Sequence, residues 1–284
     1  MRWLVIGAGG MLGWDLQRSL AERDVVATKR RDLDITDYDA ALEVIMRVRP
    51  DVVVNSAAWT AVDAAETDEA GAFAVNAIGA ANVAQACSRI DARMVHVSTD
   101  YVFDGTASTP YPEHANVCPR SAYGRTKAAG EWAVRSALPQ GSWIVRTAWL
   151  YGEAGQNFVR RMIQLEAERD SIDVVDDQRG QPTWSAEVAR QIVKMMDADV
   201  PPGIFHATAT GSATWYDLAR SVFELLGTDP DRVRPTDSTA FARPAPRPAY
   251  SVLSHDAWAR AGLVPLPHWK ASLSHAFDAL ASAR

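Results

Sequence analysis

Short apolar runs alternate with longer amphipathic segments along the first half of the chain. The runs are rich in Val, Ile and Leu and lack a polar face, which is typical of strands buried on both sides of a parallel sheet. We expect strands at Trp3–Ile6, Asp24–Thr28, Asp51–Asn55, Arg93–Ser98 and Ser142–Arg146. The segments between them predict helices at Met11–Glu22, Tyr38–Arg49, Asp68–Ile90 and Ser121–Ala137. This alternation predicts right-handed βαβ units and an α/β fold with a doubly wound parallel sheet of the Rossmann type.

The alternation becomes less regular after about residue 151. Helices are expected near Phe158–Arg169, Ser185–Met196, Trp215–Leu226 and His268–Ala281, and strands near Ile172–Val175 and Gly203–Ala207. We therefore expect a first domain at residues 1–150 and a smaller C-terminal α/β lobe at 151–284. The segment at about 185–207 is expected to rejoin the first domain, because its strand can return to the first sheet.

A glycine-rich stretch, GAGGMLG, follows the first predicted strand directly. Its glycines Gly7, Gly10 and Gly13 are spaced three residues apart, at the junction of a strand and a helix. Such a turn lets backbone N–H groups approach a pyrophosphate, which the N-terminus of the following helix stabilises. A plain tight turn is the alternative, but the position in a βαβ pattern favours a dinucleotide-binding site. The first domain is therefore expected to bind NAD(P).

The end of the second predicted strand bears on the choice of cofactor. An acidic residue there would bind a ribose 2′-hydroxyl, whereas this chain has Lys29, Arg30 and Arg31. Basic side chains suit a 2′-phosphate, so we predict a preference for NADPH, with NADH as the alternative. The other interpretation is a solvated basic turn whose charge is balanced by the nearby Asp32 and Asp34.

Two further motifs carry candidate chemistry. In SAYGRTK, Tyr123 and Lys127 lie four residues apart and so share one face of a helix. A nearby ammonium favours phenolate and lowers the pKa of a phenol, which makes it a better proton donor near neutral pH. In HVSTDYVFDG, Ser98 and Thr99 end a predicted strand, where ligands bind in parallel sheets, although such hydroxyls can also simply cap a strand end.

Together these residues compose one mechanism. Hydride passes from a nicotinamide to a carbonyl carbon while Tyr123 protonates the carbonyl oxygen. Lys127 is expected to lower the pKa of the tyrosine and to hold the cofactor ribose, and Thr99 to orient the carbonyl. The mechanism requires no metal.

Composition and charge narrow the other classes of function. The net charge is −6 and acidic residues are scattered, which argues against a nucleic-acid surface. The N-terminal apolar run is too short for a signal sequence or a membrane span, so a cytoplasmic protein is expected. Cys87 and Cys118 lack the spacing of a disulfide framework or a zinc site.

The motifs resemble those of the extended short-chain dehydrogenase/reductases and, within that superfamily, the dTDP-4-dehydrorhamnose reductase family. The resemblance spans essentially the whole chain: GAGGMLG, DLDITD, PDVVVNSAAWTAVDAAE, AVNA, STDYVFDG, YGRTK, RTAWLYG, VVDDQRGQPT and RPAYSVLS. Of these, STDYVFDG and DDQRGQPT are far more specific than the superfamily motifs. The resemblance implies reduction of a dTDP-linked 4-keto-6-deoxysugar to dTDP-L-rhamnose with NADPH or NADH.

The resemblance also implies a role for each matching residue. Its catalytic residues are Thr99, Tyr123 and Lys127. Its cofactor contacts are Gly7, Gly10, Met11, Leu12, Gly13, Asp34, Ile35, Ala57, Ala58, Tyr123 and Lys127, to which the basic turn adds Lys29 and Arg30. Its substrate contacts are Asp100, Tyr101, Trp149, Arg247 and Ser251, and the C-terminal lobe at 151–284 is expected to bind substrate. For Tyr101 and Trp149, core packing is the alternative.

Departures from the family pattern leave some points open. Trp59 stands where the family usually has Tyr or His, and Tyr250 where Asn is common, which affects the shape of the sugar and nucleotide pockets. Some members dimerise around Mg²⁺; here Asp15, Glu187 and Asp278 lie near the corresponding places, so the chain is expected to be a monomer or a homodimer. A different nucleotide-sugar reductase or epimerase, or a non-catalytic regulatory subunit, remains an alternative, although the intact Thr99, Tyr123 and Lys127 oppose the last.

Overall fold

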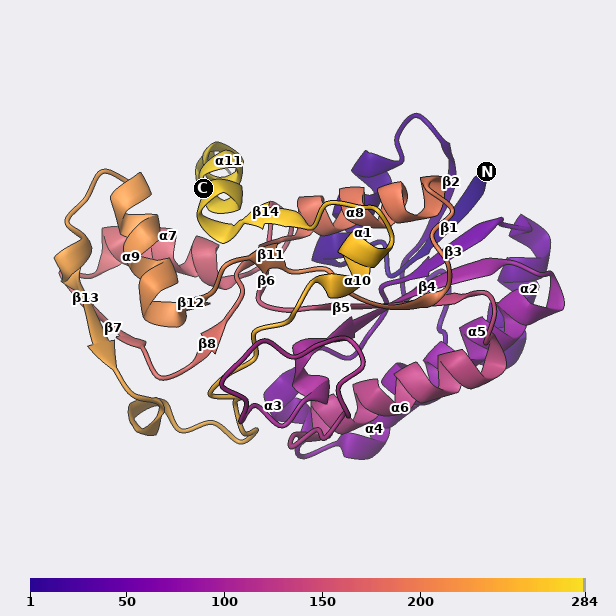
Figure 1. The fold of residues 1–284 in the computed structure, drawn as a ribbon, viewed down its shortest axis with the longest axis horizontal. Helices are drawn as coiled ribbons and strands as arrows, with labels where there is room; N and C mark the ends of the chain where they lie inside the picture. The colour runs from indigo at the N-terminus through magenta and orange to yellow at the C-terminus, as the bar shows by residue number, and fades with distance from the viewer. Residues whose placement is uncertain (283–284) are drawn as a thin grey trace.

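The centre of the protein is a six-stranded, all-parallel sheet, seen in a computed structural model that describes residues 1–282 (Figure 1). Its order is β10-β5-β4-β3-β1-β2. The strands are β1 (Arg2–Ile6), β2 (Asp24–Thr28), β3 (Val52–Asn55), β4 (Arg93–Thr99), β5 (Ser142–Thr147) and β10 (Gly203–His206). The order reverses at β1, which lies between β2 and β3, so the predicted doubly wound sheet is confirmed.

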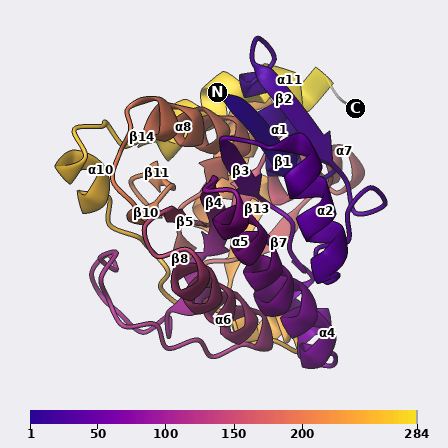
Figure 2. The same ribbon diagram turned by 90° about the vertical axis from the view of Figure 1, so that its right-hand side faces the viewer.

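Helices cover both faces of this sheet (Figure 2). Alternate residues of β1 divide between them: Trp3 and Val5 face one layer, Leu4 and Ile6 the other. The first layer contains α1 (Met11–Ser19), α8 (Ser185–Asp197) and the short α10 (Asp256–Arg260). The second contains α2 (Tyr38–Val48), α5 (Ala80–Arg89) and α6 (Ala122–Ala137). Burial on both faces explains why the strands read as continuous apolar runs.

The single helix predicted at Asp68–Ile90 is helical throughout but not uniform. It begins as α4 (Glu69–Phe73), widens into a π-helix (η1, Ala74–Gly79) and continues as α5. A shorter helix, α3 (Val62–Ala65), precedes it. In the π-helical part, Asn76 bonds both backbone polar groups of Trp59, with N···O distances of 2.8 and 3.1 Å, and so ties the loop after β3 to this helix.

A second, smaller body packs beyond the carboxyl ends of the strands, at the left of Figure 1. It has its own apolar core. Its helices are α7 (Phe158–Glu168), α9 (Trp215–Leu225) and α11 (Trp269–Ser282). Its longest strand pair is parallel, β7 (Ile172–Val175) with β13 (Val233–Thr236). The remaining strands are the short β6 (Leu150–Tyr151), β8 (Arg179–Gly180), β9 (Thr183–Trp184), β11 (Ala209–Thr210), β12 (Ala213–Thr214) and β14 (Leu266–His268).

The chain returns to the large sheet after it has entered this second body. β10 pairs in parallel with β5, with Phe205 opposite Val145, and α8 packs beside α1 on the sheet. The segment near 185–207 therefore lies with the first 150 residues. The assignment of 151–284 to substrate binding stays a prediction, and residues 283–284 lie outside the described part of the chain.

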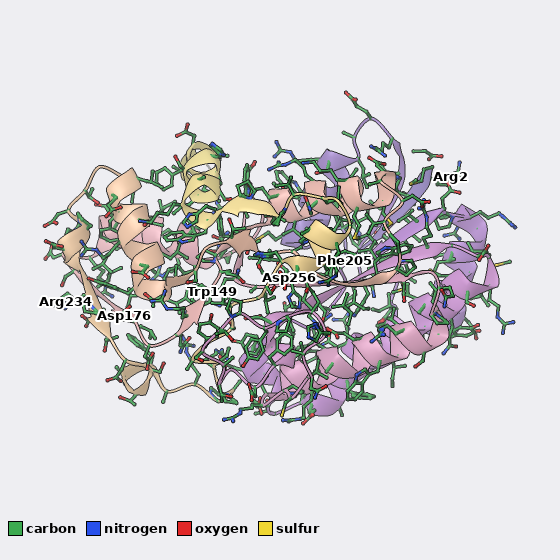
Figure 3. The ribbon with its side chains drawn as sticks, viewed as in Figure 1. Arg2, Trp149, Asp176, Phe205, Arg234 and Asp256 are labelled. Carbon is green, nitrogen blue, oxygen red and sulfur yellow. The ribbon has the colours of Figure 1, made fainter. Side chains whose placement is uncertain are left out.

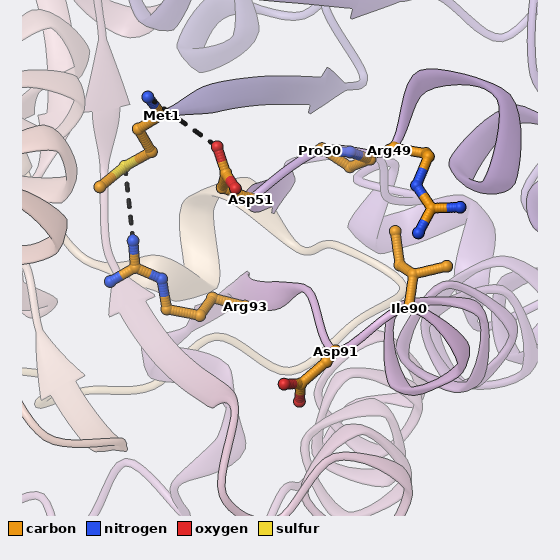
Figure 4. A pocket seen from close by; sticks show the side chains of 7 residues that line it. All are labelled: Met1, Arg49, Pro50, Asp51, Ile90, Asp91 and Arg93. Atoms are coloured by element: carbon orange, nitrogen blue, oxygen red, sulfur yellow. Dashed lines mark hydrogen bonds and ion pairs between the residues drawn. The ribbon is translucent and has the colours of Figure 1, made fainter.

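Two cavities lie at opposite edges of the sheet. The one at the amino ends of the strands has a volume of about 620 Å³ (Figure 4). Its charged groups are already engaged in part: Arg93 pairs with Asp199 at 3.2 Å, and the terminal amine of Met1 lies 3.9 Å from Asp51. It contains none of the predicted site residues. Among the described residues, no helix is long and apolar enough to span a membrane.

Candidate active site

The second cavity, of about 830 Å³, lies at the carboxyl edge of the sheet and is bordered by the second body. Loops after β1, β2, β3, β4 and β5 line it, together with the start of α6. It brings together most of the predicted residues: Gly7, Gly10, Met11, Leu12, Gly13, Arg30, Asp34, Ile35, Ala57, Ala58, Thr99, Asp100, Tyr101, Tyr123, Lys127, Trp149 and Arg247. Two predicted residues, Lys29 and Ser251, are not part of its wall.

The glycine loop forms one end of this cavity. Gly7 has φ +85°, and a Cβ there would lie 2.6 Å from the backbone nitrogen of Ala57 in the neighbouring loop. A Cβ on Gly13 would overlap the carbonyl oxygen of Gly7. The following helix, α1, starts after Gly10 with no side-chain cap and no acidic residue in its first turn. Its N–H groups are therefore available to an anion in the cavity.

The basic turn after β2 splits between two environments. Arg30 lies on the cavity wall, whereas the backbone N–H of Lys29 donates to the carboxylate of Asp32. Asp32 also lies 3.6 Å from the guanidinium of Arg31. Asp34 faces the cavity, and the Thr36 backbone and hydroxyl groups that bond its carboxylate lower its pKa. The turn is thus partly balanced by Asp32, and Arg30 is the base that reaches the cavity.

The three predicted catalytic side chains meet at the centre of the cavity. Thr99 ends β4, and Tyr123 and Lys127 occupy the first turns of α6, which Ser121 caps through the N–H of Gly124 at 3.1 Å. All three catalytic candidates are buried. Burial raises the pKa of Tyr123 to about 12. The hydroxyl of Thr99 lowers this pKa, and the negative charge of Asp100 raises it further.

The expectation that Lys127 lowers the pKa of Tyr123 is wrong for this structure. The ammonium of Lys127 donates to the carbonyl oxygen of Val97 at 2.6 Å, and the phenol shows no shift from its charge. Burial instead lowers the pKa of Lys127 to about 8. Desolvation therefore dominates the pKa of both groups and keeps the phenol protonated at neutral pH.

Aromatic and charged side chains form the other end of the cavity. Tyr101 packs edge-on against Tyr123, with ring centroids 5.6 Å apart. Trp149 has φ +48° and stacks on Trp215, with centroids 3.6 Å apart and planes 4° apart. Figure 3 shows Trp149 between the sheet and the second body. The left-handed backbone of a bulky residue is strained, so tertiary contacts hold Trp149 in this place.

Arg247 reaches the same end of the cavity from the proline-rich loop near the C-terminus. Its guanidinium bonds the carboxylate of Asp63 in α3 at 3.0 Å. Asp63 also accepts from the backbone N–H of Ala245 at 3.2 Å. One carboxylate thus anchors the loop and orients the arginine.

Several cavity residues were missed by the sequence analysis. They include Thr147, Gln156, Gln178 and Trp215. Trp59, which the sequence analysis named as a departure that affects the pocket shape, also lines the cavity. Gln178 stands in VVDDQRGQPT, so that motif was a usable signal, and it accepts from the indole N–H of Trp215 at 3.2 Å. Trp215 had no comparable signal, because it begins an ordinary amphipathic helix in the second body. Ser251 is buried behind the wall, where its hydroxyl opposes the rise in the pKa of Asp100.

Comparison with known proteins agrees with this geometry. The family model described as RmlD substrate binding domain matches residues 1–282. The chain belongs to the RmlD family. It is 53% identical over 285 residues to a dTDP-4-dehydrorhamnose reductase of Streptomyces griseus, which covers 98% of this chain and 94% of the relative.

Two other comparisons give similar matches. The chain is 53% identical over 281 residues to a dTDP-4-keto-6-deoxy-D-glucose reductase of Streptomyces niveus, with 98% and 97% coverage. A crystal structure of dTDP-4-dehydrorhamnose reductase from Bacillus anthracis in complex with NADP matches with a TM-score of 0.93, 37% identity and 98% coverage of both chains. The RmlD-family resemblance and the Rossmann-type fold are therefore confirmed.

A magnesium site at a dimer contact, considered above from the family resemblance, has no support. The carboxylate of Asp15 accepts from Ser185 at 2.5 Å, and that of Glu187 accepts from Ser272 at 2.6 Å. Residues 1–282 contain no group of three or more His, Cys, Asp or Glu side chains that could hold a metal ion. Asp278 joins neither carboxylate in such a group.

The buried Asp100 predicts an unusual dependence of stability on pH. Burial raises its pKa to about 6 from 3.8, so the folded state binds a proton more tightly than the unfolded chain, and stability falls as pH rises between these values. The difference corresponds to about 3 kcal/mol. We expect Asp100→Asn to be more stable than the wild type at pH 8 by up to this amount, and equally stable below pH 4.

Urea unfolding at both pH values measures this effect. Asp104→Asn is the matched control. The Tyr111 hydroxyl lowers the pKa of Asp104, so ionisation of this carboxyl stabilises the folded state as pH rises. That variant should lose stability at pH 8. A lower stability of Asp100→Asn at pH 8 would contradict the prediction.

Proposed function

We propose that this chain reduces the 4-keto group of dTDP-4-dehydro-6-deoxy-L-mannose to give dTDP-L-rhamnose, with NADPH as the preferred reductant. The observation that carries the proposal is the convergence of Thr99, Tyr123 and Lys127 with an uncapped glycine-loop helix in one cavity. Membership of the RmlD family supports the same activity. The bound NADP of the Bacillus anthracis relative supports a nicotinamide cofactor.

The cavity fits a dinucleotide. The glycine loop is a cradle that a Cβ at Gly7 or Gly13 would fill, and the free N–H groups of α1 suit a pyrophosphate. Asp34, Ile35, Ala57 and Ala58 would enclose the adenosine half, and Arg30 would meet a 2′-phosphate. When bound, the cofactor would supply the hydride, and side chains of the protein would supply the proton and orient the carbonyl.

The protein's own groups would deliver and hold the proton. Tyr123 donates its phenolic proton to the carbonyl oxygen as that oxygen gains charge. Thr99 orients the same oxygen, and Lys127 would hold the ribose of the bound cofactor. The pKa of about 12 keeps Tyr123 protonated at neutral pH, and the burial that raises it also excludes water.

The nucleotide sugar would bind where the carboxyl edge of the sheet meets the second body. Arg247 suits a diphosphate, and Tyr101 and Trp149 suit the faces of a sugar or a base. Asp100 completes this set from the end of β4, and Ser251 supports it from behind. In this proposal the C-terminal lobe supplies Arg247 and Ser251 to the substrate site, and the first 150 residues supply the other three contacts.

A reductase of a different dTDP-linked 4-keto-6-deoxysugar is the second candidate. Relatives with equal identity to this chain carry different substrate names. Trp59 lines the cavity at a position where the family pattern differs, which changes the shape of the pocket. The intact catalytic residues speak against a non-catalytic subunit.

Tyr123→Phe tests the proposed acid. The change removes the donor hydroxyl and leaves the ring, so kcat should fall by a factor of about 100 to 10,000 with dTDP-4-dehydro-6-deoxy-L-mannose. Oxidation of NADPH followed at 340 nm measures the rate, and Tyr38→Phe on α2 serves as the matched control. Turnover retained in Tyr123→Phe rejects the assigned acid. Faster turnover of another 4-ketosugar, or of a GDP- or UDP-linked one, selects the second candidate.

Arg30→Ala tests the cofactor preference. Loss of one charge-assisted contact to the 2′-phosphate should raise KM for NADPH about 10- to 100-fold and leave KM for NADH unchanged. Arg31→Ala is the control, because Arg31 is 80% exposed and pairs with Asp32 outside the cavity. A wild type that prefers NADH, or an equal effect on both cofactors, would contradict the assignment.

Gly10→Val tests the pyrophosphate cradle. A Cβ at Gly10 meets only the carbonyl oxygen of Gly7, at 3.4 Å, so the fold should accept the change while the side chain enters the cavity. We expect unchanged circular dichroism and loss of NADPH binding in a fluorescence titration. Gly9→Ala is the matched control, since its Cβ would meet only the side chain of Lys29 at 3.6 Å. Normal NADPH binding by Gly10→Val would reduce the loop to a plain turn.

A further inference from the structure

A buried ion pair lies directly behind the catalytic residues. Glu131 in α6 and Arg146 in β5 form a two-pronged contact, with N···O distances of 2.9 and 2.7 Å, and their side chains are only 3% and 2% exposed. The guanidinium of Arg146 also donates to the carbonyl oxygen of Glu113 and lies over the ring of Phe103. Such a two-pronged contact holds the carboxylate in one orientation.

Glu131 contacts the end of β4 and lies one helical turn from Lys127. The hydroxyl of Ser98, on the cavity wall beside Thr99, donates to its carboxylate at 2.6 Å. Lys127 precedes Glu131 by one helical turn on the same buried face of α6. The ammonium of Lys127 is held by Val97, the residue before Ser98. The carboxylate therefore supports both the end of β4 and the lysine.

The surroundings of Lys127 otherwise disfavour its charge. The side chain is 2% exposed, and burial lowers its pKa to about 8, while the charge of Glu131 opposes this fall. Burial and the charge of Lys127 hold the pKa of His96 in β4 well below its ordinary value, so this histidine is neutral. Arg146 adds positive charge from β5.

On the cavity side, Lys127 shares the wall with Tyr123 of its own helix and with Asp100 after β4. Tyr123 is protonated at neutral pH, and the carboxylate of Asp100 is engaged by Thr99 at 2.9 Å. Among the described residues, Glu131 is thus the carboxylate whose charge raises the pKa of Lys127.

We propose that Glu131, locked by Arg146 and Ser98, is a positioning residue that keeps Lys127 in its ammonium form beside the catalytic tyrosine. Glu131 itself does not reach the substrate. Its effect on the reaction rests on the proposed function, because it acts through Lys127. Its effect on Lys127 is a property of the folded chain alone and can be measured without substrate or cofactor.

Lysine-selective ¹³C NMR tests the inference directly. The chain has four lysines, at 29, 127, 194 and 270, and Lys127 is the buried one. In the wild type its ε-carbon should titrate well below the other three. In Glu131→Gln, which keeps the shape and hydrogen-bonding capacity, the pKa of Lys127 should fall by about one unit. Glu43→Gln, at the exposed pair with Arg47, is the matched control and should change nothing.

The pH profile of kcat/KM gives the second readout. The ammonium is lost as pH rises through the pKa of Lys127, so the alkaline limb of the profile should move to lower pH in Glu131→Gln. A merely structural role would lower activity at every pH without moving this limb. Unchanged values for the lysine pKa and the limb overturn the proposal.

A double variant covers a folding failure. Glu131→Gln leaves Arg146 unpaired, and a buried unpaired charge is strongly destabilising. In Glu131→Gln with Arg146→Gln, both charges are removed, and the pKa of Lys127 should lie between those of the wild type and the single variant. A wild-type pKa in the double variant rejects the role of Glu131. If the pKa of Lys127 shifts in the variant but the wild type reduces no ketosugar, the proposed function is rejected and the electrostatic role of Glu131 is retained.

Discussion

Parallel pairing of β1, β3, β4 and β5 is the constraint on which the site depends. Because all the strands point the same way, the loops that follow them reach one edge of the sheet. The glycine loop, the Ala57 loop and Thr99 come from three different βα connections and still line one cavity. No local feature of those loops would bring them together. The sheet therefore acts as a fixed frame, and the chemistry is carried by its carboxyl edge.

The same sheet that positions the site residues also buries them and removes them from water. A residue at the end of a central strand is surrounded by helices, so its charged form is desolvated. Burial raises the pKa of Tyr123 and Asp100 and lowers that of Lys127, in each case toward the neutral group. An ionised lysine in such a place needs a fixed carboxylate nearby. The pair of Glu131 and Arg146 has that geometry, because the two-pronged contact with Arg146 holds the carboxylate in one orientation.

The sequence predicted the sheet and most of the cavity for identifiable reasons. Continuous apolar runs mark strands buried on both sides, the motifs at their ends name Gly7 and Thr99, and the helical spacing in SAYGRTK names Tyr123. What it missed depends on tertiary placement. Lys29 and Arg30 are adjacent in the chain, and only the course of the backbone decides that Arg30 faces the cavity. Trp215 reaches the site from another body, and the pKa of Tyr123 is set by burial that no spacing reveals.

The division of labour between the two bodies explains how similar chains can act on different sugars. In the proposed function the sheet edge supplies the groups that hold the cofactor and move the proton, and these groups do not depend on the sugar. The far wall is assembled from single side chains of separate elements: Trp149 at a strained turn, Trp215 at the start of α9 and Arg247 held by Asp63. A change in any one of them reshapes the pocket and leaves the catalytic residues in place. Substrate choice can therefore diverge within the family while the chemistry stays constant.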